Sequence, residues 1–231
     1  MTKWFFVTMV GTVAMLVGDG MGQRKVNPVF APVEDAEGLP RVLLIGDSIS
    51  IGYTLGVRKL LEGKANVHRP PANCASTIEG KANLERWLGE GKWDVIHFNW
   101  GLHDLKYLGP NGGNLADPKL ETSKQKVEIG DYEKSLGELV ERLEKTGATL
   151  IWRNTTPVPQ GVRGRVPGDA VKYNAAAAKV MVAKGVETHD LFTYAKKREA
   201  EIQRKADVHY TKEGSAALAA EVAKVIEAAL K

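Results

Sequence analysis

The sequence predicts an α/β fold in which helices cover both faces of a parallel sheet. Short apolar runs rich in β-branched residues alternate with helical segments five times after residue 41. The first of these runs, Val42 to Ile45, is wholly apolar, which is typical of a parallel strand buried on both faces. The chain has 231 residues, 43% of them hydrophobic, enough for the core of one ordinary domain.

The first strand is expected at Val42 to Ile45, followed by a helix over 53–62. The other strands are expected at 66–69, 94–100, 149–153 and 186–191. The other helices are expected at 77–88, with Ser76 or Thr77 as its cap, and at 132–145, 170–184, 194–205 and 212–231. Residues 105–130 form a long polar segment, a length typical of a functional lid or a disordered loop, and its role stays open.

The N-terminus has the pattern of a secretory signal peptide. A positive start at Lys3 precedes an uncharged apolar stretch over 4–17, and Gly20 and Gly22 supply small residues before a cleavage point at Gln23. An uncleaved membrane anchor is the alternative, although the stretch is shorter than the ~20 residues that span a bilayer. We therefore expect a signal peptide over 1–22, a flexible lead-in over 23–40 and a single domain over 41–231. The mature protein is expected to be secreted or periplasmic, without stable membrane insertion.

Charge and cysteine content narrow the partners. The net charge is only +4, and basic and acidic residues are interleaved, so nucleic-acid binding is not expected. Because Cys74 is the only cysteine, no intramolecular disulfide can form, and we expect Cys74 to be a small packing residue. No spacing of His, Cys, Asp or Glu resembles a zinc or calcium site, so no metal or cofactor is expected. The oligomeric state stays open.

A glycine-flanked turn, Gly46-Asp47-Ser48, follows the first strand. A phosphate-binding loop would end in Lys-Ser or Lys-Thr, but no lysine occurs before Lys59, and the three close glycines of a dinucleotide site are absent. A nucleophilic serine needs a histidine base, and His209 stands in a turn at the matching edge of the sheet. The turn therefore favours Ser48 as a nucleophile over its other common use as a helix cap.

The Gly-Asp-Ser turn and the late Asp207-Val208-His209 resemble the SGNH (GDSL-type) hydrolase family over most of residues 41–220. The likeness is greatest to secreted bacterial carbohydrate O-acetyl esterases. It implies a three-layer α/β/α sandwich around a five-stranded parallel sheet, of flavodoxin-like type. It also implies that Ser48 is the nucleophile and His209 the base.

The resemblance implies an oxyanion hole with two departures from the family. The backbone N–H groups of Ser48 and Ala75 are two donors, with Ala75 where the family has glycine. His103, in Gly101-Leu102-His103-Asp104, stands where the family has asparagine and is the third donor, with Asn73 or Asn99 as alternatives. Asp104 is expected to brace this turn.

The third departure concerns the acid. One residue separates Asp207 from His209, where the family usually has two. Asp207 is expected to orient His209, with Asp190 or no acid at all as alternatives.

The resemblance implies hydrolysis of small acyl esters, most simply acetyl esters, of a carbohydrate or another small-molecule alcohol. A short-chain lipid esterase or acyltransferase and a catalytically lapsed carbohydrate-binding module are the alternatives. The candidate substrate contacts are Asn73, Asn99, Arg163 and Arg165. Together with Arg153, these two arginines are candidates for binding an anionic sugar, or else belong to a solvated loop.

Overall fold

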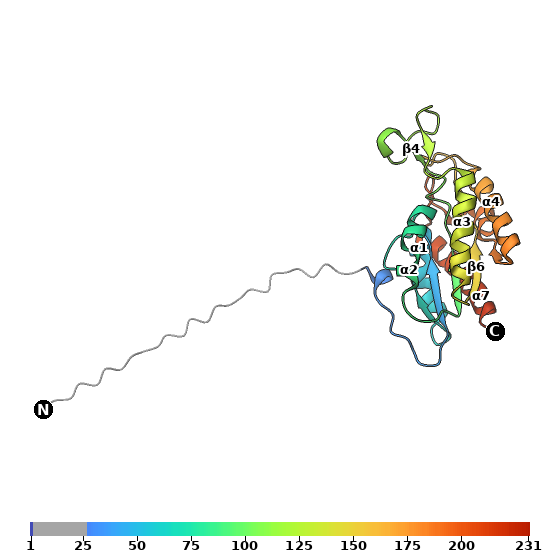
Figure 1. The fold of residues 1–231 in the computed structure, drawn as a ribbon. Coiled ribbons are helices and arrows are strands. Elements are labelled where there is room, and N and C mark those ends of the chain that lie inside the picture. The colour runs from blue at the N-terminus through green and yellow to red at the C-terminus, as the bar shows by residue number, and fades with distance from the viewer. Residues whose placement is uncertain (2–26) are drawn as a thin grey trace.

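The structure is a computed structural model that describes Met1 and residues 27–231 (Figure 1). The predicted signal peptide over 1–22 and the start of the lead-in lie outside the described residues, apart from Met1. Among the described residues, no helix is both long enough and apolar enough to cross a bilayer.

The five predicted strands form one parallel sheet in the order β2-β1-β3-β6-β7. The strands are β1 (Arg41–Ile45), β2 (Asn66–His68), β3 (Val95–Phe98), β6 (Thr149–Arg153) and β7 (Glu187–His189). In register, Ile45 pairs with Phe98 and Phe98 with Trp152, so the central strands end at one level. The loops that follow them therefore meet at one edge, where ligands of such sheets bind.

Helices cover both faces of this sheet, which confirms the predicted three-layer fold (Figure 1). One layer pairs α1 (Ser48–Leu60) with α7 (Lys212–Ala229), and the other places α3 (Ile129–Glu144) between α2 (Thr77–Leu88) and α4 (Asp169–Lys184). The predicted helix over 194–205 is instead two short helices, α5 (Leu191–Lys197) and α6 (Glu199–Ile202).

The first helix begins five residues earlier than predicted. The side chain of Asp47 accepts the backbone N–H of Ile49 at 3.0 Å and so caps α1 directly after the strand. Ser48 is consequently the first residue of the helix, at the carboxyl edge of the sheet.

The long polar segment after β3 is an ordered hairpin. Its two short strands, β4 (Tyr107–Leu108) and β5 (Lys124–Gln125), pair antiparallel and flank η2 (Pro110–Gly112). We call residues 105–128 the hairpin insertion; it stands beyond one end of the sheet, at the top of Figure 1. Tyr107 N–H donates to Gly164 O at 2.8 Å, which ties the insertion to the loop after β6.

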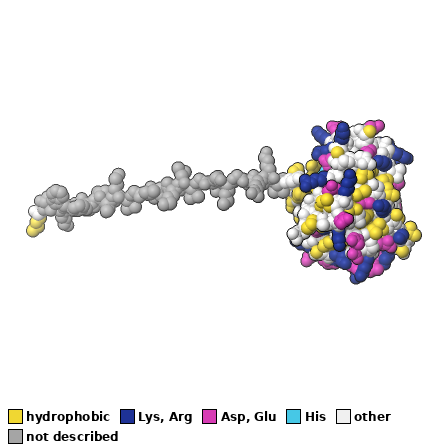
Figure 2. All heavy atoms as spheres, turned by 90° about the horizontal axis from the view of Figure 1, so that it is seen from above, with side chains coloured by type: hydrophobic (Ala, Val, Ile, Leu, Met, Phe, Trp, Pro, Cys, Tyr) yellow, Lys and Arg dark blue, Asp and Glu magenta, His cyan; other side chains and the backbone are white. Residues whose placement is uncertain are grey.

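Residues 27–40, the described part of the lead-in, lie against the domain. They begin with a short helix, η1 (Pro28–Phe30), and Val29 is buried. The side-chain amide of Asn66 on β2 donates to Ala36 O and Leu39 O, at 3.0 and 3.1 Å. Viewed from above, basic and acidic side chains are interspersed over the domain rather than gathered in blocks (Figure 2).

Candidate active site

Ser48 and His209 meet at the carboxyl edge of the sheet although 161 residues separate them. The Oγ of Ser48 lies 2.9 Å from Nε2 of His209. Gly46 makes the turn before Ser48 compact, since a Cβ there would lie 3.0 Å from Ser50 Cβ. His209 is placed by the start of α7, where Thr211 caps the helix through the N–H of Gly214 at 2.9 Å. The structure thus brings the predicted nucleophile and base within hydrogen-bond distance.

Asp207 stands on the other side of the histidine ring. Its Oδ1 lies 2.7 Å from His209 Nδ1 and also accepts the His209 backbone N–H at 3.1 Å. Burial alone would raise the pKa of Asp207, but these two hydrogen bonds outweigh it and hold the pKa below its ordinary 3.8. An ionised carboxylate only accepts hydrogen bonds, so Nδ1 carries the proton and Nε2 is free to take one from Ser48.

Asp190, the alternative acid, is occupied elsewhere. Its Oδ1 accepts the side-chain amide of Asn154 at 2.7 Å and the backbone N–H of Thr193 at 3.0 Å. Asp190 therefore caps α5, and the geometry favours Asp207 as the acid of the site.

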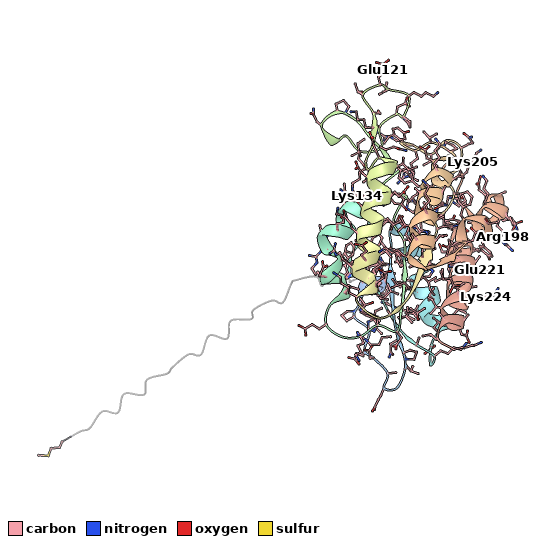
Figure 3. The ribbon with its side chains drawn as sticks, turned by 45° about the vertical axis from the view of Figure 1, so that its right-hand side comes forward. Glu121, Lys134, Arg198, Lys205, Glu221 and Lys224 are labelled. Carbon is pink, nitrogen blue, oxygen red and sulfur yellow. The ribbon has the colours of Figure 1, made fainter. Side chains whose placement is uncertain are left out.

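The space at the reactive serine is small and open. Ser48 and His209 line a cavity of about 150 Å³ together with Gly52, Tyr210 and Ser215. The side chain of His209 is 44% exposed, so the predicted base is accessible from solvent. Lys205, in the loop before Asp207, lies at the outer surface of the molecule (Figure 3).

The turn at Ala75 packs against the nucleophile turn, because Cys74 N–H donates to Gly46 O at 3.2 Å. Ala75 has a φ of +46°, in the left-handed region that favours glycine. Its N–H, a predicted oxyanion donor, donates to Asn73 Oδ1 at 3.0 Å. Sequence reasoning missed this internal partner, which an incoming oxyanion must replace. Burial raises the pKa of the Cys74 thiol to about 11, in keeping with a packing residue.

His103 lies half-buried in the turn after β3. Burial lowers its pKa from 6.5, and the charges of Lys106 and Arg165 add to that effect against the attraction of Asp47. Its ring makes no hydrogen bond with the described residues. A neutral imidazole carries one N–H, so His103 retains a donor for a ligand.

Asp104 braces this turn as expected. Its Oδ1 accepts the backbone N–H and the hydroxyl of Thr77, at 2.9 and 2.5 Å, and so joins the turn to the start of α2.

Asn99, predicted as an alternative oxyanion donor and a substrate contact, serves neither role in this structure. It is 1% exposed, its Nδ2 donates to Arg153 O at 2.7 Å, and its Oδ1 accepts Arg153 Nη2 at 2.6 Å. Arg153 is itself fully buried, so neither alternative for it, a contact with an anionic sugar or a place in a solvated loop, fits this structure. Its Nη2 lies 3.9 Å from Asp47 Oδ1, below the nucleophile turn.

A second buried arginine, Arg69, was not foreseen. Its Nη1 donates to Ser50 Oγ at 2.9 Å and to Thr54 Oγ1 at 3.0 Å, which fixes α1 from below. Arg153 ends the mainly apolar strand β6, which is a signal for burial, whereas Arg69 follows the polar strand β2 and carries no such signal.

The two remaining arginines differ in position. Arg165 is half-buried, and its Nε donates to Leu102 O, next to His103, at 3.1 Å. Burial lowers its pKa, against the attraction of Asp47 and Asp207. Arg163 is exposed, and its Nε donates to Leu115 O in the hairpin insertion at 3.2 Å. Across residues 27–231, no group of three or more His, Cys, Asp or Glu side chains is placed to hold a metal ion.

Comparison with known proteins shows similarity in structure only. No protein-family model and no curated protein sequence matches the chain. A lipase/acylhydrolase from Enterococcus faecalis superposes with a TM-score of 0.65 at 16% identity, covering 82% of this chain and 96% of its own. The acetylxylan esterase Axe2 from Geobacillus stearothermophilus has a TM-score of 0.63 at 18% identity, covering 81% and 93%.

A member of the lipolytic G-D-S-L family from Veillonella parvula has a TM-score of 0.58 at 16% identity, covering 80% and 97%. At these identities the likeness establishes the fold. The resemblance inferred from the Gly-Asp-Ser turn is therefore confirmed at the level of architecture.

Proposed function

We propose that this protein, which has the fold of the SGNH (GDSL-type) hydrolases, is a serine carboxylic ester hydrolase that removes small acyl groups, chiefly acetyl, from a carbohydrate. One observation carries the proposal. Ser48 Oγ, the His209 ring and the Asp207 carboxylate form a continuous chain, with contacts of 2.9 and 2.7 Å. This is the arrangement that activates a serine for acyl transfer.

The reaction has two steps. Ser48 Oγ attacks the acyl carbonyl carbon while its proton moves to His209 Nε2, and His209 then protonates the departing alcohol oxygen. Water attacks the acyl-enzyme carbonyl carbon and gives a proton to the same nitrogen. His209 then returns this proton to Ser48 Oγ as the acyl–oxygen bond breaks, which releases the acid and restores the serine. Asp207 keeps Nδ1 protonated and stabilises the imidazolium formed in both steps.

Three donors are assigned to the tetrahedral oxyanion: the N–H groups of Ser48 and Ala75 and the ring N–H of His103. The N–H of Ala75 exchanges Asn73 Oδ1 for the oxyanion as the charge develops. A donor of this kind is worth about 3 kcal/mol in the transition state. His103→Ala is therefore expected to lower kcat about 100-fold, and His103→Gln, which keeps an N–H, by less.

One observation supports a small acyl group on a sugar. Among the structures of the same fold, Axe2 is named as an acetylxylan esterase. A lipid esterase or an acyltransferase would use the same three residues, and the assay below separates them.

Covalent labelling tests the nucleophile. A fluorophosphonate is expected to modify the wild-type protein at Ser48 and to leave Ser48→Ala unlabelled. Ser135→Ala, a serine change on α3, serves as the matched control and should be labelled like wild type. Absence of label, or label at another serine, would contradict the mechanism and favour a lapsed binding module.

Substrate profiles test the rest of the proposal. Hydrolysis of 4-nitrophenyl acetate is expected to exceed that of the butyrate and octanoate esters, with free acetate as the product even when excess alcohol is present. Faster turnover of octanoate would identify a lipid esterase, and transfer to the alcohol an acyltransferase.

We also propose that the protein is exported, on the basis of the N-terminal sequence pattern. Intact mass and N-terminal sequencing of the exported protein are expected to show cleavage before Gln23. Retention of residues 1–22 would indicate an anchored form.

A further inference from the structure

A second and larger cavity, of about 760 Å³, opens beside the reactive site. Residues 115–119 of the hairpin insertion form one wall, and residues 160–167 of the loop after β6 form the other. This volume lies within the range of pockets that hold small-molecule ligands, whereas the cavity lined by Ser48 and His209 has a volume of about 150 Å³.

The two walls are joined by close contacts. Gly164 O accepts the N–H of Tyr107 at 2.8 Å, and Arg163 Nε donates to Leu115 O at 3.2 Å. At Gly164 the backbones approach so closely that a Cβ would lie 2.4 Å from Leu115 Cα. These contacts hold the insertion against the loop and keep the cavity open between them.

The same loop contacts the reactive site at two points. Arg165 Nε donates to Leu102 O, the residue before His103. A Cβ on Gly161 would lie 3.1 Å from the Cβ of Ala206, the residue before Asp207. The loop that lines the cavity therefore also borders the reactive site, and a chain molecule whose ester group lies at Ser48 can extend towards the cavity along it.

The lining is basic, with apolar patches between the charges. Arg163, Arg165 and Lys119 carry positive charge, and Asp117 is the one acid among the described lining residues. Neither arginine has a carboxylate oxygen within 4.0 Å in the described part of the chain. Glu121, farther along the hairpin insertion, lies at its outer end, away from the body of the molecule (Figure 3).

The arginines also keep free donors. Each uses only its Nε on a backbone carbonyl, so the terminal Nη groups of both donate to no acceptor among residues 27–231. A guanidinium with free Nη groups binds planar or tetrahedral oxyanions through paired hydrogen bonds. Val162, Pro118 and Pro167 add apolar surface that suits the faces of sugar rings.

We propose that this cavity is a saccharide subsite that recognises an anionic group, a carboxylate or a sulfate, on a sugar unit next to the one that carries the ester. This inference rests on the proposed esterase function and names its substrate as an anionic acetylated oligosaccharide. Arg163 and Arg165 are the residues that bind the anion.

The experiment compares kcat/KM on three acetylated oligosaccharides of equal length: one neutral, one with a uronate and one with a sulfated unit. Wild type is expected to favour at least one anionic substrate over the neutral one by about 10-fold, the size of one charge-assisted hydrogen bond. The uronate and sulfate arms identify which oxyanion is bound. Arg163→Gln is expected to remove most of this preference.

Lys134→Gln, an equal loss of charge at an exposed site on α3, is the matched control and should keep the wild-type preference (Figure 3). Equal kcat/KM on the neutral and anionic substrates would overturn the proposal. So would an Arg163→Gln variant whose kcat/KM falls equally on all three.

A binding measurement separates this inference from the proposed function. Calorimetry with Ser48→Ala and the deacetylated anionic oligosaccharides is expected to show binding that weakens about 10-fold in Ser48→Ala/Arg163→Gln. If no acetyl ester is hydrolysed but this difference is present, the subsite stands and the proposed reaction fails. If esters are hydrolysed and no such difference is found, the subsite fails alone.

Discussion

Acidification is expected to destabilise the protein through a buried pair of histidines. His97 on β3 and His189 on β7 are 1% and 7% exposed, and His97 Nε2 lies 3.1 Å from His189 Nδ1. Burial, followed by the charge of Arg153, lowers the pKa of His189 from 6.5 to about 4, against the attraction of Asp190. Burial, the partner histidine and Arg153 also lower the pKa of His97 well below its ordinary value. Both rings are neutral in the folded protein at neutral pH.

The sign and size of the effect follow from these values. Between pH 6.5 and about 4, the unfolded chain binds a proton at His189 that the folded chain does not, so the free energy of unfolding falls as the pH falls. The full shift corresponds to about 3 kcal/mol, of which about 2 kcal/mol is lost between pH 7 and pH 5. His97 adds a loss of the same sign.

Urea unfolding at pH 7 and pH 5 measures this loss. In the double variant His97→Gln/His189→Asn, neither side chain titrates, and the amides occupy the places of the two bonded nitrogens. Wild type is expected to lose at least about 2 kcal/mol more than the variant on going from pH 7 to pH 5, because the variant removes the contributions of both histidines. Equal losses in the two proteins would refute the reasoning.

Three further changes test the site. Asp207→Asn is expected to lower kcat on 4-nitrophenyl acetate by about 100- to 10,000-fold, because the ring of His209 loses its ionised partner. The thermal midpoint is expected to stay unchanged. A wild-type kcat would exclude Asp207 as the acid. Ala75→Gly is expected to raise the free energy of unfolding by about 0.5 kcal/mol. The relief of backbone strain at a φ of +46° exceeds the cost of the entropy that glycine adds to the unfolded chain. A free energy of unfolding below that of wild type, measured in urea, would count against strain at Ala75. Gly101→Ala is expected to lower the free energy of unfolding by about 3 kcal/mol. The new Cβ would lie 2.1 Å from Thr155 Oγ1, on a residue with a φ of +150°. A urea midpoint equal to that of wild type would show that the turn relaxes.

The fold was predictable because its signals are local. The central strands β1, β3 and β6 are short, mainly apolar runs, and the long helices carry apolar stripes at helical spacing. The start of α1 was the exception, since Ser-Ile-Ser-Ile-Gly over 48–52 has low helix propensity. The cap by Asp47 and packing against α7 outweigh that propensity.

The pairing of Ser48 with His209 was predictable because parallel strands place the residues after them at one edge. What each amide or arginine binds was not predictable, since that depends on contacts between distant segments. The side-chain oxygen of Asn99 accepts a hydrogen bond from Arg153. Arg165 donates to Leu102 O beside His103, whereas Arg163 donates to Leu115 O in the hairpin insertion. Nothing in the spacing of the two exposed-looking arginines distinguishes their positions.

The short spacing between Asp207 and His209 still allows the carboxylate to contact the histidine ring. A carboxylate two residues before a backbone N–H accepts it in a local turn, and Oδ1 of Asp207 does so at 3.1 Å while also contacting the ring at 2.7 Å. The pair is thus assembled by its own short segment, with Ala206 at a φ of +52° turning the chain into it.

The rest of the fold needs only to place the Asp207–His209 segment against Ser48. Thr211 N–H donates to Ile202 O at 2.9 Å, and Gly214 lies so close to that carbonyl that a Cβ would be 2.1 Å away. The segment after His209 is therefore fixed on α6, and His209 Nε2 is held 2.9 Å from Ser48 Oγ, within hydrogen-bond distance. With two intervening residues, as the family usually has, the backbone would have to follow another path to bring the carboxylate to the ring. The shorter spacing in this chain therefore gives no reason by itself to expect a catalytically lapsed protein.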